Sequence, residues 1–387
     1  MTPFETIKLY DTDGHLSRFF AKVISCDKKD DFYEVVLDKT AFFPEGGGQE
    51  ADTGKIGEAK VSDVQINENV IIHKTDIPLE IGIEYDCEIE YDVRFRRMQN
   101  HTGEHIVSGL VHKYFGYDNT GFHMGHDDIT VDFNGMLTES DIRKIELLAN
   151  KAVFENKAVS SYYPDEDELS SLEYRSKKEI VGRVRIVNID GYDSCACCAP
   201  HVSRTGEVGI IKLLDFEKNK GGIRIHMLCG FDALEDYERR YDLMANSAKS
   251  LSIGQMQLGD AIVRLGEEIS ALKQKNYELR EELYIYKMEK IEHTEGNICI
   301  FEENIRPSDM RNLMNGALEK CGGISAVFCG SDENGYTFFA ASKNIKMREQ
   351  SVDMQEKLGA KCGGSDEMIQ GSIFADKKTI KKYFGVL

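Results

Sequence analysis

The first ninety residues alternate between apolar and polar positions. The alternation is clear at residues 19–24 and 33–37, and turn-forming residues such as Asp11-Thr-Asp-Gly14 separate such runs. A period of two predicts β-strands that bury one face and expose the other. We therefore expect residues 1–90 to form a small, largely antiparallel, barrel-like β unit.

The segment from residue 91 to residue 230 mixes the helical period of 3.6 residues with the strand period of two. Helices are expected at 94–115, 139–156 and 165–171, and strands at 129–134, 183–189 and 207–214. This mixture is typical of an α+β module.

Residues 231–292 contain no proline and predict a long helical segment. Between residues 258 and 286 the apolar positions follow a strict four–three spacing, which is a heptad repeat. Isoleucine at positions a, leucine at positions d and Asn276 at one a position favour a parallel two-stranded coiled coil. We therefore expect a homodimer through the heptad helix 258–286. The alternative is that this apolar stripe packs against the C-terminal domain of its own chain.

Residues 293–387 predict a separate α/β domain. Its strands are expected at 297–302, 325–329 and 335–341, and its helices at 308–321, 346–358 and 376–384. A glycine-rich segment around Gly363 and Gly364, followed by Gln370, is expected to form a loop. The chain as a whole is therefore expected to be α+β, divided into segments 1–90, 91–230, 231–292 and 293–387.

The composition narrows the class of protein. The chain has 387 residues, a formal net charge of −19 and ten cysteines. The negative charge argues against unspecific coating of nucleic acid, although local basic clusters can still bind RNA. No run of about twenty apolar residues predicts a transmembrane helix, and the N-terminus lacks the features of a secretory signal. Ten cysteines without export favour reduced thiols in a cytoplasmic protein, available for a metal or for catalysis.

Two short motifs carry donors for a metal ion. His101 and His105 lie four residues apart in a predicted helix, which places both imidazoles on one face. Cys197 and His201 put a thiolate and an imidazole into one short turn. Imidazole nitrogen and thiolate sulfur are preferred ligands of tetrahedral zinc, so we expect the fold to join both pairs into a Zn²⁺ site. Each pair alone is also compatible with coincidence or with buried, inert cysteine.

A loop that suits neither a strand nor a helix runs from Phe43 to Gln49. Its three consecutive glycines, Gly46, Gly47 and Gly48, allow positive φ angles and a close approach of the backbone to a ligand. By themselves, the glycines are equally compatible with a tight connection.

With these residues in view, the sequence resembles the free-standing alanyl-tRNA editing proteins of the AlaX type, in their long form. Three motifs carry the resemblance, in this order: the glycine loop with its flanks from Thr40 to Gly54, His101-Thr-Gly-Glu-His105, and the segment from Cys197 to Gly209. The C-terminal domain resembles the DHH-associated domain of long editing proteins.

Two positions depart from the family pattern. Cys198, Ala199 and Pro200 fill the turn between the second pair of ligands, where the family usually has Gly-Gly-Thr. This change leaves Cys195 or Cys198 as substitute ligands. In the C-terminal glycine segment, Ser365 stands where the family usually has an arginine, which removes a bidentate phosphate donor.

The resemblance implies a zinc-dependent hydrolase that removes chiefly serine, with glycine as a further candidate, from mischarged tRNA(Ala). It implies action in trans, because the chain leaves no room for an aminoacylation domain. Thr40 is the candidate reader of the serine hydroxyl, and Gln49 helps to place the ester. The backbone of Gly46–Gly48 would approach the substrate, and His123 would line the pocket, whereas His126 is expected on a surface loop.

Further residues are weaker candidates. Arg94 and Arg97 precede the metal helix and are candidates for contacts with tRNA phosphates, with a salt-bridged helix face as the alternative. Glu104, beside His105, is a candidate general base, and a solvated helix face is again the alternative. The loop of Gly363, Gly364 and Gln370 is the candidate RNA contact of the C-terminal domain.

Two other functions stay open from the sequence. One is the editing of another tRNA mischarged with serine. The other is a zinc-stabilised, dimeric tRNA-binding protein without catalysis.

Overall fold

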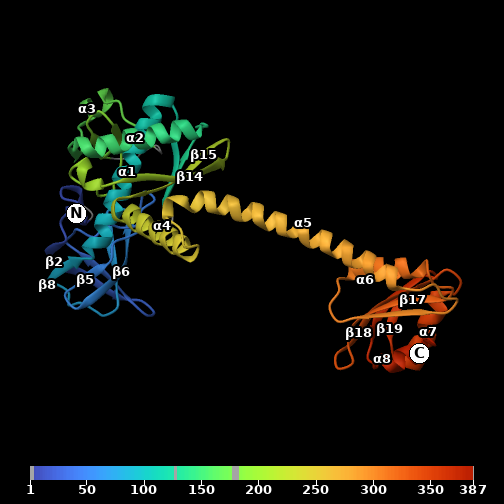
Figure 1. The fold of residues 1–387 in the computed structure, drawn as a ribbon. Helices are drawn as coiled ribbons and strands as arrows, with labels where there is room; N and C mark the ends of the chain where they lie inside the picture. The colour runs from blue at the N-terminus through green and yellow to red at the C-terminus, as the bar shows by residue number, and fades with distance from the viewer. Residues whose placement is uncertain (1–3, 126–128, 177–182, 387) are drawn as a thin grey trace. The chain divides into compact units, whose positions relative to one another are not determined.

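The computed structural model describes residues 4–125, 129–176 and 183–386. The chain consists of two compact units, Met1–Ser252 and Ile253–Leu387 (Figure 1). Helices and strands occur in both units, so the expected α+β class is confirmed. The finer division into four segments stays a prediction.

Six strands of the first unit close on themselves as a barrel, in the order β2-β3-β7-β6-β5-β8. The strands are β2 (Arg18–Lys28), β3 (Tyr33–Leu37), β5 (Gly54–Ile56), β6 (Ala59–Asn67), β7 (Val70–Thr75) and β8 (Glu84–Ile89). Every pairing is antiparallel. Buried and exposed residues alternate along β2, where Phe19, Ala21 and Val23 enter the core. Two short strands outside this ring, β1 (Ile7–Lys8) and β4 (Lys39–Thr40), pair in parallel.

Helix α1 (Tyr91–Phe115) runs through the core of the first unit. Every residue from Met98 to Val111 is buried, so the polar side chains of this stretch find their hydrogen-bond partners inside the protein, as Gln99 and Asn100 do. Gly103 allows the helix to approach its neighbour closely, because a Cβ atom there would lie 2.2 Å from Cys229 Sγ. The helix ends at Gly116, whose φ of 70° is a left-handed conformation that favours glycine.

The first unit also contains further helices and two sheets, and several of these elements contact α1. The helices are α2 (Glu139–Glu155), α3 (Glu166–Ser171) and α4 (Gly230–Ser250). A four-stranded sheet has the order β14-β15-β10-β9, with β9 (Asn119–Met124), β10 (Ile129–Phe133), β14 (Ile211–Asn219) and β15 (Gly222–Cys229). A three-stranded sheet combines β11 (Val159–Tyr162), β12 (Ile186–Ile189) and β13 (Asp193–Ala196). Thr138 and Asp141 cap the start of α2 reciprocally.

Two expected elements are different in the structure. The helix expected at 231–292 is interrupted: after α4, Ser252 has a left-handed φ of 55°, and the 3-10 turn Gln255–Gln257 precedes α5 (Leu258–Lys290). The strand expected at 207–214 starts only at Ile211, because Thr205–Val208 forms a 3-10 helix.

The second unit is a five-stranded sheet with three helices besides α5 among its described residues. The sheet order is β16-β17-β18-β20-β19. The strands are β16 (Ile298–Glu302), β17 (Ile324–Ser331), β18 (Gly335–Ser342), β19 (Lys361–Gly364) and β20 (Met368–Ile373), and the helices are α6 (Pro307–Leu318), α7 (Met347–Leu358) and α8 (Lys377–Tyr383). The prediction that Gly363 and Gly364 form a loop was wrong. Gly363 and Gly364 lie in β19, where Gly363 pairs with Gln370 of β20.

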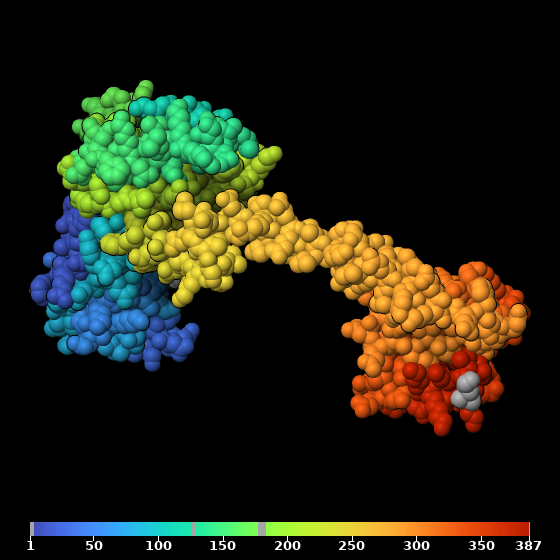
Figure 2. All heavy atoms as spheres, viewed as in Figure 1, coloured from blue at the N-terminus to red at the C-terminus, as the bar shows by residue number. Residues whose placement is uncertain are grey.

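The apolar stripe of α5 is largely exposed within the second unit. Ile262 is 60% exposed and Leu272 is 61% exposed. Figure 2 shows the middle turns of α5 standing apart from the sheet and the other helices of this unit. Among the described residues, no helix is long and apolar enough to cross a membrane.

Candidate metal centre

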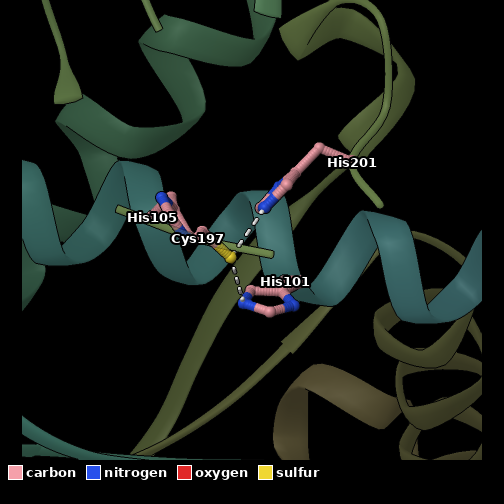
Figure 3. A group of neighbouring side chains, drawn as sticks. All are labelled: His101, His105, Cys197 and His201. Atoms are coloured by element: carbon pink, nitrogen blue, oxygen red, sulfur yellow. Dashed lines mark hydrogen bonds between the residues drawn. The ribbon is translucent and has the colours of Figure 1, made fainter. Parts of the chain in front are cut away.

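Four donor atoms meet between α1 and the turn that follows β13. They belong to His101, His105, Cys197 and His201, and all lie within 4.8 Å of one another. The structure thus brings together both ligand pairs that the sequence indicated. In Figure 3, Cys197 Sγ lies between two of the rings, 3.6 Å from His101 Nε2 and 3.4 Å from His201 Nε2.

These separations fit a tetrahedral metal. Zinc–nitrogen bonds of about 2.0 Å and zinc–sulfur bonds of about 2.3 Å, at tetrahedral angles, place nitrogen and sulfur donors about 3.5 Å apart. Three imidazoles and one thiolate also match the ligand preference of zinc. Cys198 belongs to neither cluster of potential ligands found among the described residues, whereas Cys195 lies in a second cluster with His105 and Asp193.

A different neighbour orients each of the three imidazoles. Gln49 Oε1 lies 3.1 Å from His101 Nδ1, and Thr102 Oγ1 lies 3.0 Å from His201 Nδ1. Asp193 Oδ2 lies 3.0 Å from His105 Nδ1. With Nδ1–H donating to such an acceptor, the lone pair of Nε2 is left for a metal.

The carboxylate behind His105 is itself held in place. Arg175 donates to both oxygens of Asp193, from Nε at 2.7 Å and from an Nη atom at 2.8 Å. Burial alone would raise the pKa of Asp193, but the hydrogen bonds from His105 and Arg175 outweigh burial and lower this pKa. The carboxylate therefore stays ionised and accepts the proton of His105 Nδ1.

The glycine loop contacts Phe122 of β9, and Phe122 in turn contacts the metal ligand His101. The backbone of Gly46 and that of Gln49 exchange two hydrogen bonds of 3.0 Å, which closes a tight turn. Gly48 has a φ of 87°, and a Cβ atom there would lie 2.6 Å from the carbonyl oxygen of Phe122. The ring of Phe122 lies 5.0 Å from the ring of His101. A residue with a side chain at position 48 would therefore displace a neighbour of His101.

Gln49 ends this loop with a side chain that is 1% exposed. Its Oε1 accepts from His101, while its Nε2 has no hydrogen-bond partner among the described residues. A buried donor left unpaired costs about 1–3 kcal/mol. Gln49 thus has two functions to offer: its amide oxygen orients the metal ligand His101, and its amide nitrogen is a donor beside that ligand with no partner among the described residues.

Thr40 is the last residue of β4 and is fully buried, and His73 of the barrel strand β7 fixes its hydroxyl group. His73 Nδ1 lies 3.1 Å from the carbonyl oxygen of Val35 and must donate to it, so Nε2 accepts the proton of Thr40 Oγ1 at 2.9 Å. The backbone N–H of Phe42 donates to the same hydroxyl oxygen. Burial lowers the pKa of His73 to about 4, which keeps its ring neutral.

The two candidate phosphate ligands are engaged elsewhere. Arg94 is 1% exposed, and its guanidinium pairs with the buried Asp52 and donates to the carbonyl oxygens of Gly14 and Ala41. The expected contact of Arg94 with phosphate is therefore wrong, because the group is inside the protein. Arg97 is mostly buried and donates to Glu50 and to the Ala51 carbonyl.

Two further candidates have surroundings that the sequence did not indicate. His123 follows Phe122 in β9, is exposed, and points away from the face on which Phe122 meets His101. Glu104 is not on a solvated face: its carboxylate is fully buried and accepts hydrogen bonds from Ser108 and Asn119. His126 lies outside the described residues.

Sequence reasoning missed the residues that orient the ligands. Asp193 and Arg175 reach His105 through the fold, and Asp193 is 88 positions away from it along the chain. Thr102 lies inside the first motif, but nothing in a single sequence connects it with His201. Gly363, Gly364 and Gln370 belong to the second unit.

Comparisons with known proteins relate the chain to alanyl-tRNA editing proteins and to tRNA synthetases. The model described as "Threonyl and Alanyl tRNA synthetase second additional domain" matches residues 184–226, and that of "tRNA synthetases class II (A)" matches residues 15–93. The chain is 30% identical to the alanyl-tRNA editing protein AlaX-L of Pyrococcus horikoshii, with 96% of each chain covered. It is 28% identical to an alanine–tRNA ligase of Ignicoccus hospitalis and 32% identical to that of Methanopyrus kandleri, over 93% and 74% of this chain. These matches span 40% and 33% of the two ligases, less than half of either protein.

Proposed function

This chain belongs to the family of the alanyl-tRNA editing proteins of the AlaX-L type, and on this basis we propose that it hydrolyses mischarged tRNA(Ala), chiefly Ser-tRNA(Ala). The observation that carries the proposal is the cluster of three imidazoles and one thiolate beside the free donor of Gln49. The bond to be cleaved is the ester between the amino acid and the terminal ribose of the tRNA.

The chemistry explains why such a second site is needed. A pocket for alanine cannot strongly exclude serine, which only adds a hydroxyl group. A site that binds this hydroxyl through a hydrogen bond can reject alanine by a factor of about 10⁴, because alanine would leave a buried polar group unpaired. Glycine, the further candidate substrate, also lacks the hydroxyl group, so by the same argument we expect its ester to be hydrolysed more slowly than that of serine.

The ligands of the proposed zinc ion would be His101, His105, Cys197 and His201. When bound, zinc supplies a Lewis acid that can polarise a carbonyl oxygen or hold a substrate group. Four protein ligands leave no open position, unlike most catalytic zinc sites. We therefore assign the recognition of the ester to side chains next to the ligands.

Gln49 is our candidate for contact with the reacting ester. If His101 binds zinc through Nε2, its Nδ1 carries a proton, and the oxygen of the Gln49 amide must face it. This constraint leaves Nε2 of Gln49 as a donor of fixed direction. We propose that it donates to the ester carbonyl oxygen and stabilises the negative charge that develops there during hydrolysis.

Thr40 is our candidate reader of the substrate hydroxyl. Because His73 takes the proton of Thr40 and the N–H of Phe42 takes one lone pair, the hydroxyl oxygen has one lone pair left. Thr40 can therefore accept one more hydrogen bond but cannot donate one. A serine hydroxyl meets this requirement as a donor, whereas glycine and alanine offer nothing.

The test is deacylation of seryl-, glycyl- and alanyl-tRNA(Ala) by zinc-loaded protein added to the isolated, charged tRNA. We expect fast release of serine, slow or absent release of alanine, and no activity in a His101→Ala/His105→Ala variant. If metal-loaded protein binds tRNA but hydrolyses none of the three esters, the alternative of a non-catalytic tRNA-binding protein is correct. Seryl esters on a threonine tRNA, compared in the same assay, test the other alternative.

A further inference from the structure

The turn between Cys197 and His201 is unusually constrained. Of its middle residues, Ala199 and Pro200 are buried and Cys198 is exposed, so most of the turn packs against protein. The backbone N–H of Cys197 donates to the carbonyl oxygen of Arg185, at 3.0 Å. Arg185 directly precedes β12, and its side chain contacts the same turn.

The guanidinium of Arg185 binds two carbonyl groups of this turn. One Nη atom donates to the carbonyl oxygen of Cys197 at 3.1 Å and to that of Ala199 at 2.8 Å. The side chain of Arg185 is 4% exposed, so these bonds are shielded from water. The contacts fix the backbone on both sides of Cys198, immediately after the cysteine ligand.

The other side of the guanidinium reaches the N-terminal loop. Its second Nη atom lies 3.4 Å from the carbonyl oxygen of Asp11, and its Nε lies 3.7 Å from a carboxylate oxygen of the same residue. Three residues further on, the carbonyl oxygen of Gly14 accepts a hydrogen bond from Arg94 of α1. A Cβ atom on Gly14 would lie 2.8 Å from the carbonyl oxygen of His201. The loop from Asp11 to Gly14 thus touches both the ligand turn and the helix that carries the other two ligands.

We propose that Arg185 is a positioning residue of the metal centre, which holds the Cys197–His201 turn in the shape that allows both of its ligands to face His101 and His105. Asp11 is the counter-charge that keeps the guanidinium in place. A planar guanidinium can serve two carbonyl groups and a carboxylate together, whereas the ammonium group of lysine binds as a single point. This assignment concerns the metal centre itself and does not depend on the proposed hydrolysis.

The experiment compares the full-length variants Arg185→Met, Arg185→Lys and Asp11→Asn with the unchanged protein. Zinc affinity is measured by competition with a chromophoric chelator. We expect Arg185→Met to weaken zinc binding about 10–100-fold, the range found when partners of metal ligands are removed. Arg185→Lys should also weaken it, and Asp11→Asn should have a smaller effect in the same direction. In Co²⁺-substituted protein, the sulfur-to-cobalt charge-transfer band should weaken or shift in Arg185→Met.

Arg143→Met is the control. Arg143 lies in α2, its side chain is 77% exposed, and it pairs with Glu139 of the same helix. Its replacement removes the same charge and should leave zinc affinity and the cobalt spectrum unchanged. Thermal unfolding of the metal-free proteins shows whether each variant folds. If Arg185→Met does not fold, Arg185→Lys decides the question. Unchanged zinc affinity in the folded arginine variants would overturn the proposal.

Discussion

Single residues at the metal centre have separable roles because each imidazole has its own neighbour at Nδ1. Gln49 is the most informative of these neighbours, since its two amide atoms face different groups. Its oxygen faces the metal ligand His101, and its nitrogen has no hydrogen-bond partner in the part of the chain that the structure describes. Substitutions that retain one atom and remove the other can therefore distinguish metal binding from the hydrolytic step.

Gln49→Glu retains an oxygen for His101 but removes the donor. We expect its zinc affinity to stay close to that of the unchanged protein, while the single-turnover rate on seryl-tRNA falls by about 10²–10³-fold. Gln49→Met, which has a similar shape, lacks both groups and should also weaken zinc binding about 10–100-fold. Chelator competition and single-turnover deacylation measure the two effects. A Gln49→Glu variant with an unchanged rate would exclude the amide as the donor to the ester.

Thr40→Val tests how the serine hydroxyl is read. The variant retains the shape of the side chain and removes the acceptor, so seryl-tRNA deacylation should fall about 10–100-fold while glycyl-tRNA deacylation stays the same. Thr75→Val is a suitable control, because it removes another buried hydroxyl of the barrel that binds the carbonyl oxygen of Ile77. Equal losses on both esters would indicate general damage to the barrel instead of a lost contact with serine.

His73 should make the stability of the protein depend on pH. Its pKa is about 4 in the folded chain and 6.5 when unfolded, so only the unfolded chain takes up its proton between these values. The free energy of unfolding therefore falls as the pH is lowered from 6.5 to 4, by about 3 kcal/mol for this group. Urea unfolding of metal-free protein at pH 7 and pH 4.5 measures the loss. The loss should be smaller in His73→Gln, whereas an equal loss in both proteins would assign it to other groups.

At the scale of elements, the sequence predicted the helices and strands whose apolar residues recur with a regular spacing. Strands β2 and β3 and helices α1, α2, α6 and α7 follow from spacing alone, because each buries one face or one whole stretch. The break between α4 and α5 was missed: it combines a left-handed Ser252 with Gly254, and a single glycine in a long helical pattern is only a weak signal for a break. The strand β19 was missed because glycine disfavours strands, and only the pairing with β20 explains it.

The same limit applies to the metal centre. The four donors could be found because their spacing within each pair is short. Their supporting residues could not, because Asp193, Arg175 and Arg185 reach the ligands only through sheet pairing and the packing of α1. For Arg94 the sequence was misleading: an arginine before a helix of metal ligands is compatible with RNA binding, and only the fold reveals its buried partner Asp52.

The heptad repeat of helix α5 predicts a homodimer. Its heptad positions are half exposed or more at Ile262, Ile269 and Leu272, so packing within the second unit does not account for them. Asn276→Leu should convert a defined dimer into higher or mixed oligomers, because a polar residue at position a specifies two strands at a cost in stability. Sedimentation equilibrium measures the mass. Gln274→Ala, at the outward position f, should leave it unchanged, and a monomeric unchanged protein would contradict the prediction.

At the scale of the whole molecule, charge and chemistry are unevenly divided between the two units. All four metal ligands, Thr40 and Gln49 lie in the first unit, which has its own hydrophobic cores. The second unit has 18 lysines and arginines against 21 acidic residues, a net charge of −3, which leaves −16 of the total −19 in the first. The more acidic unit thus contains the proposed reaction site for a polyanionic substrate.

A fragment of residues 1–252 tests this division. We expect it to bind zinc like the full chain and to hydrolyse seryl-tRNA at a similar rate at saturating tRNA, because the fragment contains the complete centre. Its KM for tRNA should be higher, since a strongly acidic unit repels phosphates and the lysines of α8 are absent. The KM of the full chain should rise with salt, because counterion release at lysine–phosphate contacts favours binding at low salt. If the fragment has the same KM and the same salt dependence, the second unit does not contact tRNA phosphates; if it fails to bind zinc, the first unit needs the second to form the metal centre.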